Sequence, residues 1–236
     1  MPFWTDGNNH CTRTRNAQFT SRQMNKLCSF LESNNINCSS QVYDFSPSQI
    51  IPDSKHIPYP PKVYEKSKKI NTILGDLDSE NYDFIIFMDS DLLIAPEDYD
   101  LFLDIVINLQ KNQIAFFDLA KLGEDDTAKI TREEKVSFKS LHYSYAYSGK
   151  KEYGPLKGCI GGLGGLYIAP VKLLLSVGGY DEKFKGWGGE DNDLLTRLLN
   201  QKKLSIKNTK PIKLFAPYHL NHLRDHSNPL YSKRFS

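Results

Sequence analysis

The sequence predicts an α/β fold in which helices flank a twisted, mostly parallel central sheet. Two uninterrupted apolar runs of strand length, Phe84–Met88 and 114–117, have the pattern of strands that are buried on both faces. Between them, apolar residues recur at helical spacing over residues 101–109, with charged residues in the intervening positions. A strand, a helix and a second buried strand in this order are typical of a βα unit in a mostly parallel sheet.

Hydrophobic periodicity also predicts the remaining elements. These are a helix around residues 24–31, a strand that begins at 42, a basic helix over 62–74, a short helix over 171–177 and a helix over 190–199. Gly178 and Gly179 are expected to end the short helix. Residues 122–151 are polar and charged, which predicts a long excursion from the sheet.

Composition excludes several classes of protein. The chain has 236 residues with 30 Lys+Arg and 28 Asp+Glu, so its net charge is only +2, and no nucleic-acid partner is indicated. The 39% hydrophobic and 25% charged residues indicate a globular domain. No apolar stretch approaches the roughly 20 residues of a transmembrane helix, and the first ten residues lack the pattern of a signal peptide.

The four cysteines, Cys11, Cys28, Cys38 and Cys159, include no CxxC pair. Neither a disulfide framework nor a zinc knuckle is therefore expected. Reduced thiols are typical of a cytoplasmic protein, and peripheral association with the inner face of a membrane stays open.

An acidic turn, Asp89-Ser90-Asp91, follows directly after the predicted strand Phe84–Met88. Ligands of parallel sheets bind beyond the carboxyl ends of the strands. Two carboxylates separated by one small residue can face one divalent cation, which in turn can hold a diphosphate. The alternative is structural: Asp89 caps the turn and Asp91 is solvated.

The string GWGGEDND, residues 186–193, is the strongest signal in the sequence. Acidic residues at a helix start are favoured by the helix dipole, and Asp193 is expected to pair with Arg197 at i,i+4. Capping of this helix by its acidic residues does not explain why a tryptophan, Trp187, stands between glycines. A large aromatic ring on a flexible hinge predicts a loop that closes over a sugar.

Two imidazoles, His219 and His222, stand near the carboxyl terminus at a spacing that allows them to converge on a metal ion. This interpretation requires the segment to meet Asp91 in space; otherwise the histidines are surface polar residues. Neither GxGxxG before a helix nor GxxxxGK[ST], the two common phosphate-binding loops, is present.

Taken in order, these motifs resemble the GT-A glycosyltransferases, particularly the inverting β-1,4-galactosyltransferases and the GalNAc-transferring domains of bacterial chondroitin-type polymerases. The segments that carry the resemblance are 84–91, 161–165, 179–180, 186–193 and 219–224. Retaining relatives typically carry WGGEN, so the aspartate of WGGED favours the inverting branch.

This resemblance implies a single GT-A (Rossmann-like) domain over residues 1–236. Its nucleotide-sugar-binding part would span about 1–120 and its acceptor and catalytic part about 150–236. The expected location is the cytoplasm, or the Golgi lumen if the sequence is cut from a longer eukaryotic chain.

The resemblance also implies a role for each matching residue. Metal binding, of Mn²⁺ or Mg²⁺, is implied for Asp89, Asp91, His219 and His222. His219 falls where the galactosyltransferases carry a methionine ligand. Contacts to the UDP-sugar are implied for Pro2, Phe3, Tyr64, Lys66, Asp89, Ser90 and Asp91. Catalytic roles are implied for Asp191 as the base, Glu190 as a sugar contact and Trp187 as the residue of the closing loop.

The implied function is metal-dependent, inverting transfer of a Gal- or GalNAc-like sugar from a UDP-sugar to a hydroxyl of a glycan acceptor, in surface polysaccharide or glycoconjugate synthesis. Three alternatives use the same residues differently. A metal-dependent nucleotide-sugar hydrolase would release free sugar without an acceptor. A carbohydrate-binding module would bind no nucleotide, and a nucleotidyltransferase would have no obvious use for GWGGED.

Overall fold

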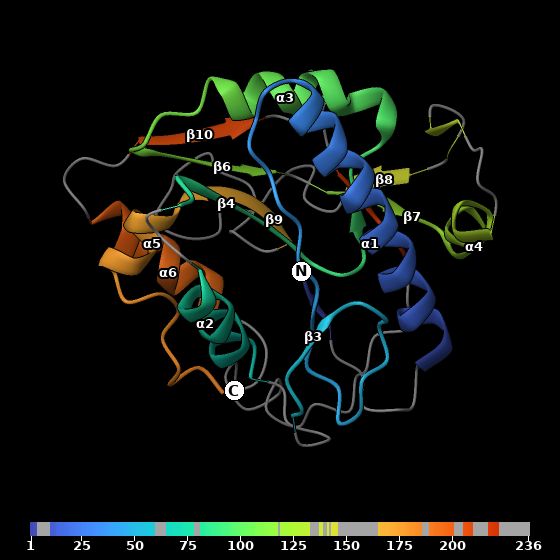
Figure 1. Cartoon of the computed structure of the whole chain (residues 1–236), viewed down its shortest axis with the longest axis horizontal. Helices are drawn as coiled ribbons and strands as arrows, with labels where there is room; N and C mark the ends of the chain where they lie inside the picture. Colours follow the sequence, from blue (N-terminus) through green and yellow to red (C-terminus); the bar gives the residue numbers. More distant parts are fainter. Residues whose placement is uncertain are drawn as a thin grey trace.

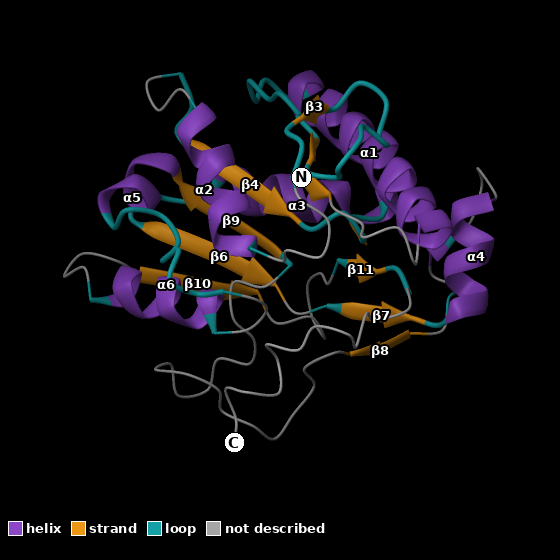
Figure 2. Ribbon diagram, turned by 90° about the horizontal axis from the view of Figure 1, so that it is seen from below, coloured by secondary structure: helices purple, strands orange, loops and turns teal. Residues whose placement is uncertain are grey.

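A four-stranded central sheet with helices on both faces organises the chain (Figures 1 and 2). The computed structural model describes residues 1–3, 10–59, 65–77, 81–117, 119–132, 137–138, 141, 143–145, 165–185, 189–200, 205–209 and 217–221. Among these residues, no helix combines the length and the hydrophobicity that crossing a membrane requires.

The central sheet has the strand order β10-β6-β9-β4. Its strands are β10 (Ser205–Thr209), β6 (Gln113–Phe117), β9 (Leu166–Pro170) and β4 (Phe84–Met88). β10 and β6 are parallel, but β9 is antiparallel to both β6 and β4. β4, β6 and β10 therefore share one direction, as expected for a mostly parallel sheet, and β9 is the reversed strand. A strand buried on both faces has the same apolar pattern in either direction, so the sequence could not reveal the reversal.

Two smaller sheets extend the structure. β1 (Pro2–Phe3), β2 (Tyr43–Asp44) and β3 (Lys55–His56) form a parallel sheet. The third sheet has the order β5-β11-β7-β8, with β5 (Leu92–Leu93), β11 (Tyr218–His219), β7 (Ala120–Leu122) and β8 (Tyr143–Tyr145). β11 is antiparallel to β5 and parallel to β7, so the end of the described chain lies beside the acidic turn.

Helices cover the two faces of the central sheet (Figure 1). α2 (Lys66–Asp76), α5 (Val171–Ser176) and α6 (Glu190–Leu199) pack on one face. α1 (His10–Ser33) and α3 (Tyr99–Ile107), which follows the 3₁₀ turn η1 (Pro96–Asp98), pack on the other. The helices predicted around 24–31, 101–109, 171–177 and 190–199 are confirmed.

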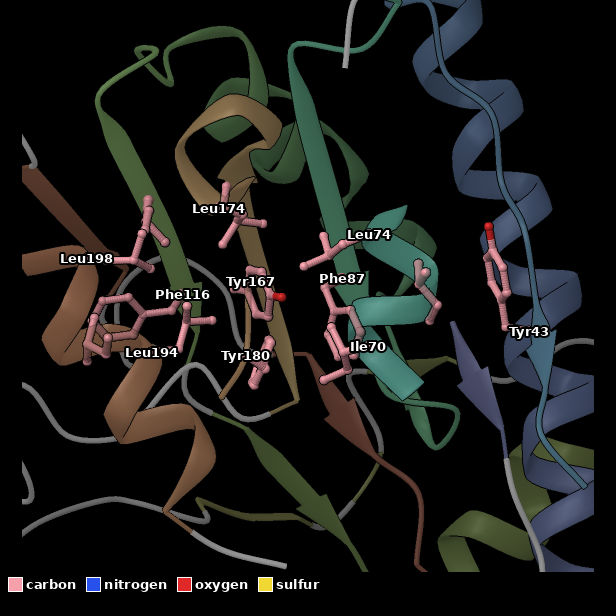
Figure 3. Packing of buried hydrophobic residues seen from close by; sticks show 14 of the residues in the cluster. Tyr43, Ile70, Leu74, Phe87, Phe116, Tyr167, Leu174, Tyr180, Leu194 and Leu198 are labelled. Atoms are coloured by element: carbon pink, nitrogen blue, oxygen red, sulfur yellow. The ribbon is translucent and has the colours of Figure 1, made fainter. Parts of the chain in front are cut away.

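Side chains along the central strands point alternately to the two faces of the sheet and so form two separate hydrophobic layers. Phe87, Phe116 and Tyr167 face α2, α5 and α6 (Figure 3), and the Phe87 and Tyr167 rings stack with centroids 5.1 Å apart. Their neighbours in the strands pack toward α1 and α3; these are Met88, Ala115, Phe117, Leu166 and Ile168. This period of two divides the apolar residues of β4, β6 and β9 between two cores.

The polar excursion after residue 122 contains a helix that the sequence analysis missed, α4 (Glu124–Arg132). Its first turn carries three acidic residues and its last turn carries Lys129 and Arg132, an arrangement that the helix dipole stabilises. The basic helix predicted over 62–74 corresponds to α2, which begins at Lys66 in the described part of the chain. Residues 60–64 lie outside the described residues.

Lys69 is a buried cation on α2. Its ammonium lies 4.8 Å from the centroid of the Tyr59 ring and 5.8 Å from that of Phe45. Burial lowers the pKa of Lys69 to about 7, and the charge of Glu65 opposes the decrease. The unfolded chain binds a proton here up to about pH 10.5, so the free energy of unfolding should rise as pH increases from about 7 to 10.5.

Lys69→Met should therefore raise the free energy of unfolding by about 1–3 kcal/mol at pH 7, because an apolar side chain replaces a buried charge. The gain should shrink toward pH 10. Urea denaturation at several pH values measures both effects, with Lys68→Met, an exposed neighbour, as the control. A gain that does not vary with pH would show that Lys69 is not held neutral.

Candidate active site

The acidic turn lies between β4 and β5, at the carboxyl end of the buried strand. The Asp89 backbone N–H donates to the Gly165 carbonyl at 2.8 Å, and the Leu92 N–H donates to the Asp89 carbonyl at 3.2 Å. Asp89, Ser90 and Asp91 are all half-buried. The turn is thus held by its backbone, which leaves both carboxylates for other contacts.

β11 brings His219 to this turn. His219 pairs with Leu92, and the Leu220 N–H donates to the Asp91 carbonyl at 2.8 Å. His219 Nε2 lies 3.7 Å from Asp91 Oδ2, and both side chains are about one-fifth exposed. Ligand bond lengths of about 2.0–2.6 Å allow one cation to bridge atoms at this separation.

The first turn of α6 contributes two more carboxylates. Gly189 precedes the helix with φ 91°, and a Cβ there would lie 3.1 Å from the Phe184 ring, so this position favours glycine. Glu190 is only 1% exposed, whereas the Asp191 side chain is 20% exposed. The helix N-terminus stabilises negative charge at both positions.

Lys66, the first residue of α2, joins the two helices. Its Nζ lies 2.8 Å from Asp191 Oδ2 and 3.6 Å from Glu190 Oε1, and its side chain is 10% exposed. A contact over 125 positions in sequence thus connects the nucleotide part and the catalytic part that the resemblance implies.

Electrostatics join these groups into one site. Burial raises the pKa of the Asp89 carboxyl to about 7. The Lys66 charge opposes this rise, and the carboxylates of Asp91, Asp191 and Glu190 add to it. Among the described residues, the charges that act on Asp89 are therefore three carboxylates and one lysine. A divalent cation would neutralise this excess of negative charge.

The donor set fits a hard cation in part. Carboxylate oxygens and an imidazole nitrogen suit Mn²⁺ and Mg²⁺. Within the described residues, however, no three His, Cys, Asp or Glu side chains are placed to hold a metal ion. His222, the fourth predicted ligand, lies outside them.

The other predicted site residues lie wholly or in part outside the described residues. Trp187 and Tyr64 lie outside the described residues. Pro2 and Phe3 are described only as the backbone of β1, which pairs with β2 at Tyr43 and Asp44.

The structure also reveals polar residues that sequence reasoning left without a role. The Tyr180 hydroxyl donates to Asp191 Oδ1 at 3.1 Å, and Asn71 on α2 bonds the Tyr180 backbone. The predicted pair of Asp193 with Arg197 is confirmed at 2.7 Å. Asn71 lies on the same helix as Lys66, but no pattern in the sequence links it to residue 180.

Part of the chain matches a known protein family. Residues 141–223 match the family model described as the N-terminal domain of galactosyltransferase. This range contains α6 and β11, which carry Glu190, Asp191 and His219.

Two solved structures resemble most of the chain. A Drosophila β1,4-galactosyltransferase 7 mutant, in complex with manganese, UDP-Gal and xylobiose, is 12% identical over 92% of this chain and 74% of that chain, with a TM-score of 0.50. The catalytic domain of Drosophila β1,4-galactosyltransferase 7 with xylobiose is 14% identical over 92% of this chain and 68% of that chain, with a TM-score of 0.44. The chain has the mixed α/β, Rossmann-like fold of the GT-A nucleotide-sugar transferases, as the sequence predicts.

Proposed function

We propose that the protein is a metal-dependent, inverting glycosyltransferase. It moves a galactose- or GalNAc-like sugar from a UDP-sugar donor to a hydroxyl of a glycan acceptor. The observation that carries the proposal is the meeting of Asp91, His219, Lys66 and Asp191 from four separate segments in one electrostatic site. The galactosyltransferase match over 141–223 supports it, as does the neighbour bound to manganese, UDP-Gal and xylobiose.

Asp91 and His219 would hold the cation, with Asp89 and His222 assisting. A divalent cation there would stabilise the negative charge that develops on the diphosphate as it leaves. The half-buried setting of the acidic turn strengthens each of these interactions relative to water.

Lys66 would supply a second positive charge to the diphosphate. A lysine ammonium is a compact charge on a flexible stem, so it can exchange one anionic partner for another. In the structure its ammonium contacts Asp191 at 2.8 Å and Glu190 at 3.6 Å. Turning toward the donor would release the Asp191 oxygen that Lys66 now covers.

Asp191 would accept the proton of the acceptor hydroxyl as that oxygen attacks the anomeric carbon. The new C–O bond forms while the bond to the diphosphate breaks, and UDP leaves with the electron pair. Attack from the face opposite the diphosphate inverts the anomeric centre. Trp187 would close over the sugars and exclude water, which otherwise hydrolyses the donor.

A panel of nucleotides tests the binding side of this proposal. UDP and UDP-sugars should raise the melting temperature in the presence of Mn²⁺ and much less in EDTA, because ligands that bind the native state stabilise it. Stabilisation by no nucleotide would favour a carbohydrate-binding module. Release of pyrophosphate from a nucleoside triphosphate would favour a nucleotidyltransferase.

The role in surface polysaccharide or glycoconjugate synthesis is part of the same proposal. This role depends on which molecule accepts the sugar. An array of immobilised glycans can identify the acceptor once a donor is known. Transfer to a saccharide hydroxyl supports this role, and transfer to water alone supports a hydrolase.

A further inference from the structure

We propose that Tyr180 is a positioning residue that determines which oxygen of Asp191 acts as the base. Its hydroxyl holds Oδ1, so that Oδ2, the oxygen beside Lys66, is the one that receives the proton. The inference rests on the proposed function, in which Asp191 is the base, and adds a residue to it.

The two oxygens of Asp191 have partners of different character. Oδ1 accepts a hydrogen bond from Tyr180, whose side chain is 2% exposed and packed in the core between α2 and α6. Oδ2 contacts Lys66, a long side chain on the first residue of α2. A diphosphate can draw the lysine away, whereas the tyrosine ring is fixed by packing.

Tyr180 is also fixed through its backbone. Its N–H donates to Asn71 Oδ1 at 2.8 Å, and its carbonyl accepts from Asn71 Nδ2 at 2.8 Å. Gly179 has φ 66°, and a Cβ there would lie 2.5 Å from Asn71 Oδ1. The close approach of this amide therefore requires glycine at position 179.

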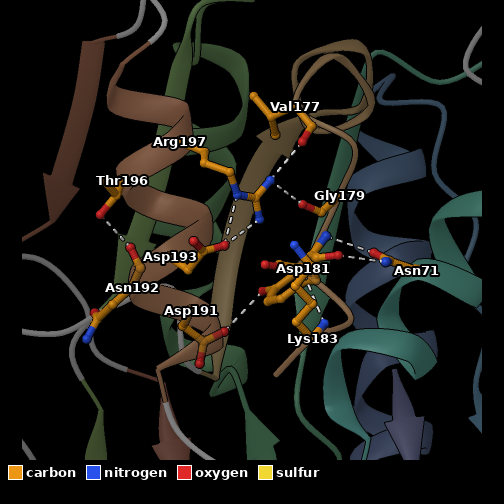
Figure 4. A network of polar contacts seen from close by, with 11 residues as sticks. Asn71, Val177, Gly179, Asp181, Lys183, Asp191, Asn192, Asp193, Thr196 and Arg197 are labelled. Carbon is orange, nitrogen blue, oxygen red and sulfur yellow. Dashed lines mark hydrogen bonds and ion pairs between the residues drawn. The ribbon is translucent and has the colours of Figure 1, made fainter. Parts of the chain in front are cut away.

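Arg197 holds the preceding residues from the other side (Figure 4). Its Nη1 donates to the carbonyls of Val177 and Gly179, each at 2.7 Å, and its guanidinium pairs with Asp193 on the same helix. Segment 177–180 is thus held by both α2 and α6. Asp191 lies on α6, the same helix whose Arg197 holds the two carbonyls beside Tyr180, so one helix positions both the carboxylate and the segment that carries the tyrosine.

This arrangement prepares the carboxylate for proton transfer. Fixing Oδ1 orients the carboxylate plane before the acceptor arrives, which removes a reorganisation from the reaction step. Burial keeps the pKa of the Tyr180 phenol well above its usual range, so the hydroxyl retains the hydrogen that it donates.

Tyr180→Phe, which removes only the hydroxyl, should lower kcat about ten- to hundredfold, the scale of a hydrogen bond to a charged group. The KM for the donor should change less than about twofold. Tyr99→Phe is the matched control, because Tyr99 is also a buried tyrosine, with its hydroxyl 3.4 Å from the Gln23 carbonyl, and it packs in the core on the other face of the sheet from Tyr180. Its kcat should equal that of the wild type.

A double-mutant cycle separates positioning from general stability. In an Asp191→Asn background, Tyr180→Phe should cause little further loss, because its effect passes through the carboxylate. Asn71→Ala should give a smaller loss in kcat that likewise disappears in that background. This second variant tests the inference should Tyr180→Phe fail to fold.

Wild-type kcat in Tyr180→Phe, or an undiminished loss in the Asp191→Asn background, would overturn the inference and leave the proposed function intact. A wild-type protein that transfers no sugar from any UDP-sugar would overturn both. The two failures are therefore distinguishable in one set of assays.

Discussion

Asp191→Asn should lower the rate of sugar transfer by about 10²–10⁴-fold, the usual contribution of a general base. The amide has nearly the same shape, so it should still fit between Lys66 and Tyr180, but it accepts a proton poorly. Calorimetry should show UDP affinity close to that of the wild type, because Asp191 is proposed to act on the acceptor and not on the nucleotide. The loss should therefore appear in kcat.

Asp100→Asn is the matched control for this variant. Asp100 is the second residue of α3, as Asp191 is of α6, but it is exposed, and α3 packs on the opposite face of the central sheet from α6. Its transfer rate should match the wild type. Unchanged turnover in Asp191→Asn, measured as donor consumption with acceptor present, would remove Asp191 from the mechanism.

Asp91→Ala should abolish most of the manganese-dependent gain in UDP affinity. Asp91 is the carboxylate that lies beside His219, and removing one charged ligand leaves an incomplete site. Calorimetric titrations with UDP, with Mn²⁺ and with EDTA, measure the gain directly. For the variant the two affinities should be nearly equal, and both should be close to that of the wild type in EDTA.

Asp83→Ala tests whether this loss is specific to the turn. Asp83 precedes the other end of β4 and pairs with Lys111 at an exposed position. Its manganese dependence should be that of the wild type. An Asp91→Ala protein that keeps the full gain would contradict the assignment of Asp91 to the metal.

Local patterns predicted much of the fold. The apolar run Phe84–Met88 is β4 with the same bounds, and the GWGGEDND string leads into α6 at Glu190. Both patterns are short and continuous, because the sequence features of a buried strand and of a helix start are confined to about ten residues. The acidic turn could be placed for the same reason, since it follows β4 directly.

Long-range arrangement could not be predicted in the same way. The reversed direction of β9 is a matter of its pairing with β4 and β6, two strands distant in sequence, and no local pattern encodes it. The pairing of β5 with β11, which brings His219 to Asp91, is a contact between two strands of two residues each. The resemblance placed these residues in one site, but the bare sequence could not.

Polar contacts between core residues were the least predictable. Tyr180 follows two glycines and has the pattern of an ordinary turn, yet its hydroxyl reaches Asp191. Lys69 lies in the middle of a basic helix and would be expected in solvent, yet it is buried against Tyr59. Whether a polar side chain turns inward is decided by its tertiary neighbours.

The most direct test of the central claim is the rate of UDP-sugar consumption by the wild-type protein under four conditions, with and without Mn²⁺ and with and without a saccharide acceptor. If Asp91, His219, Lys66 and Asp191 form one transferase site, UDP release should be fast only when Mn²⁺ and the acceptor are both present. The second product should then be a glycoside. Release at full rate without acceptor, or equally fast release in EDTA, would contradict it.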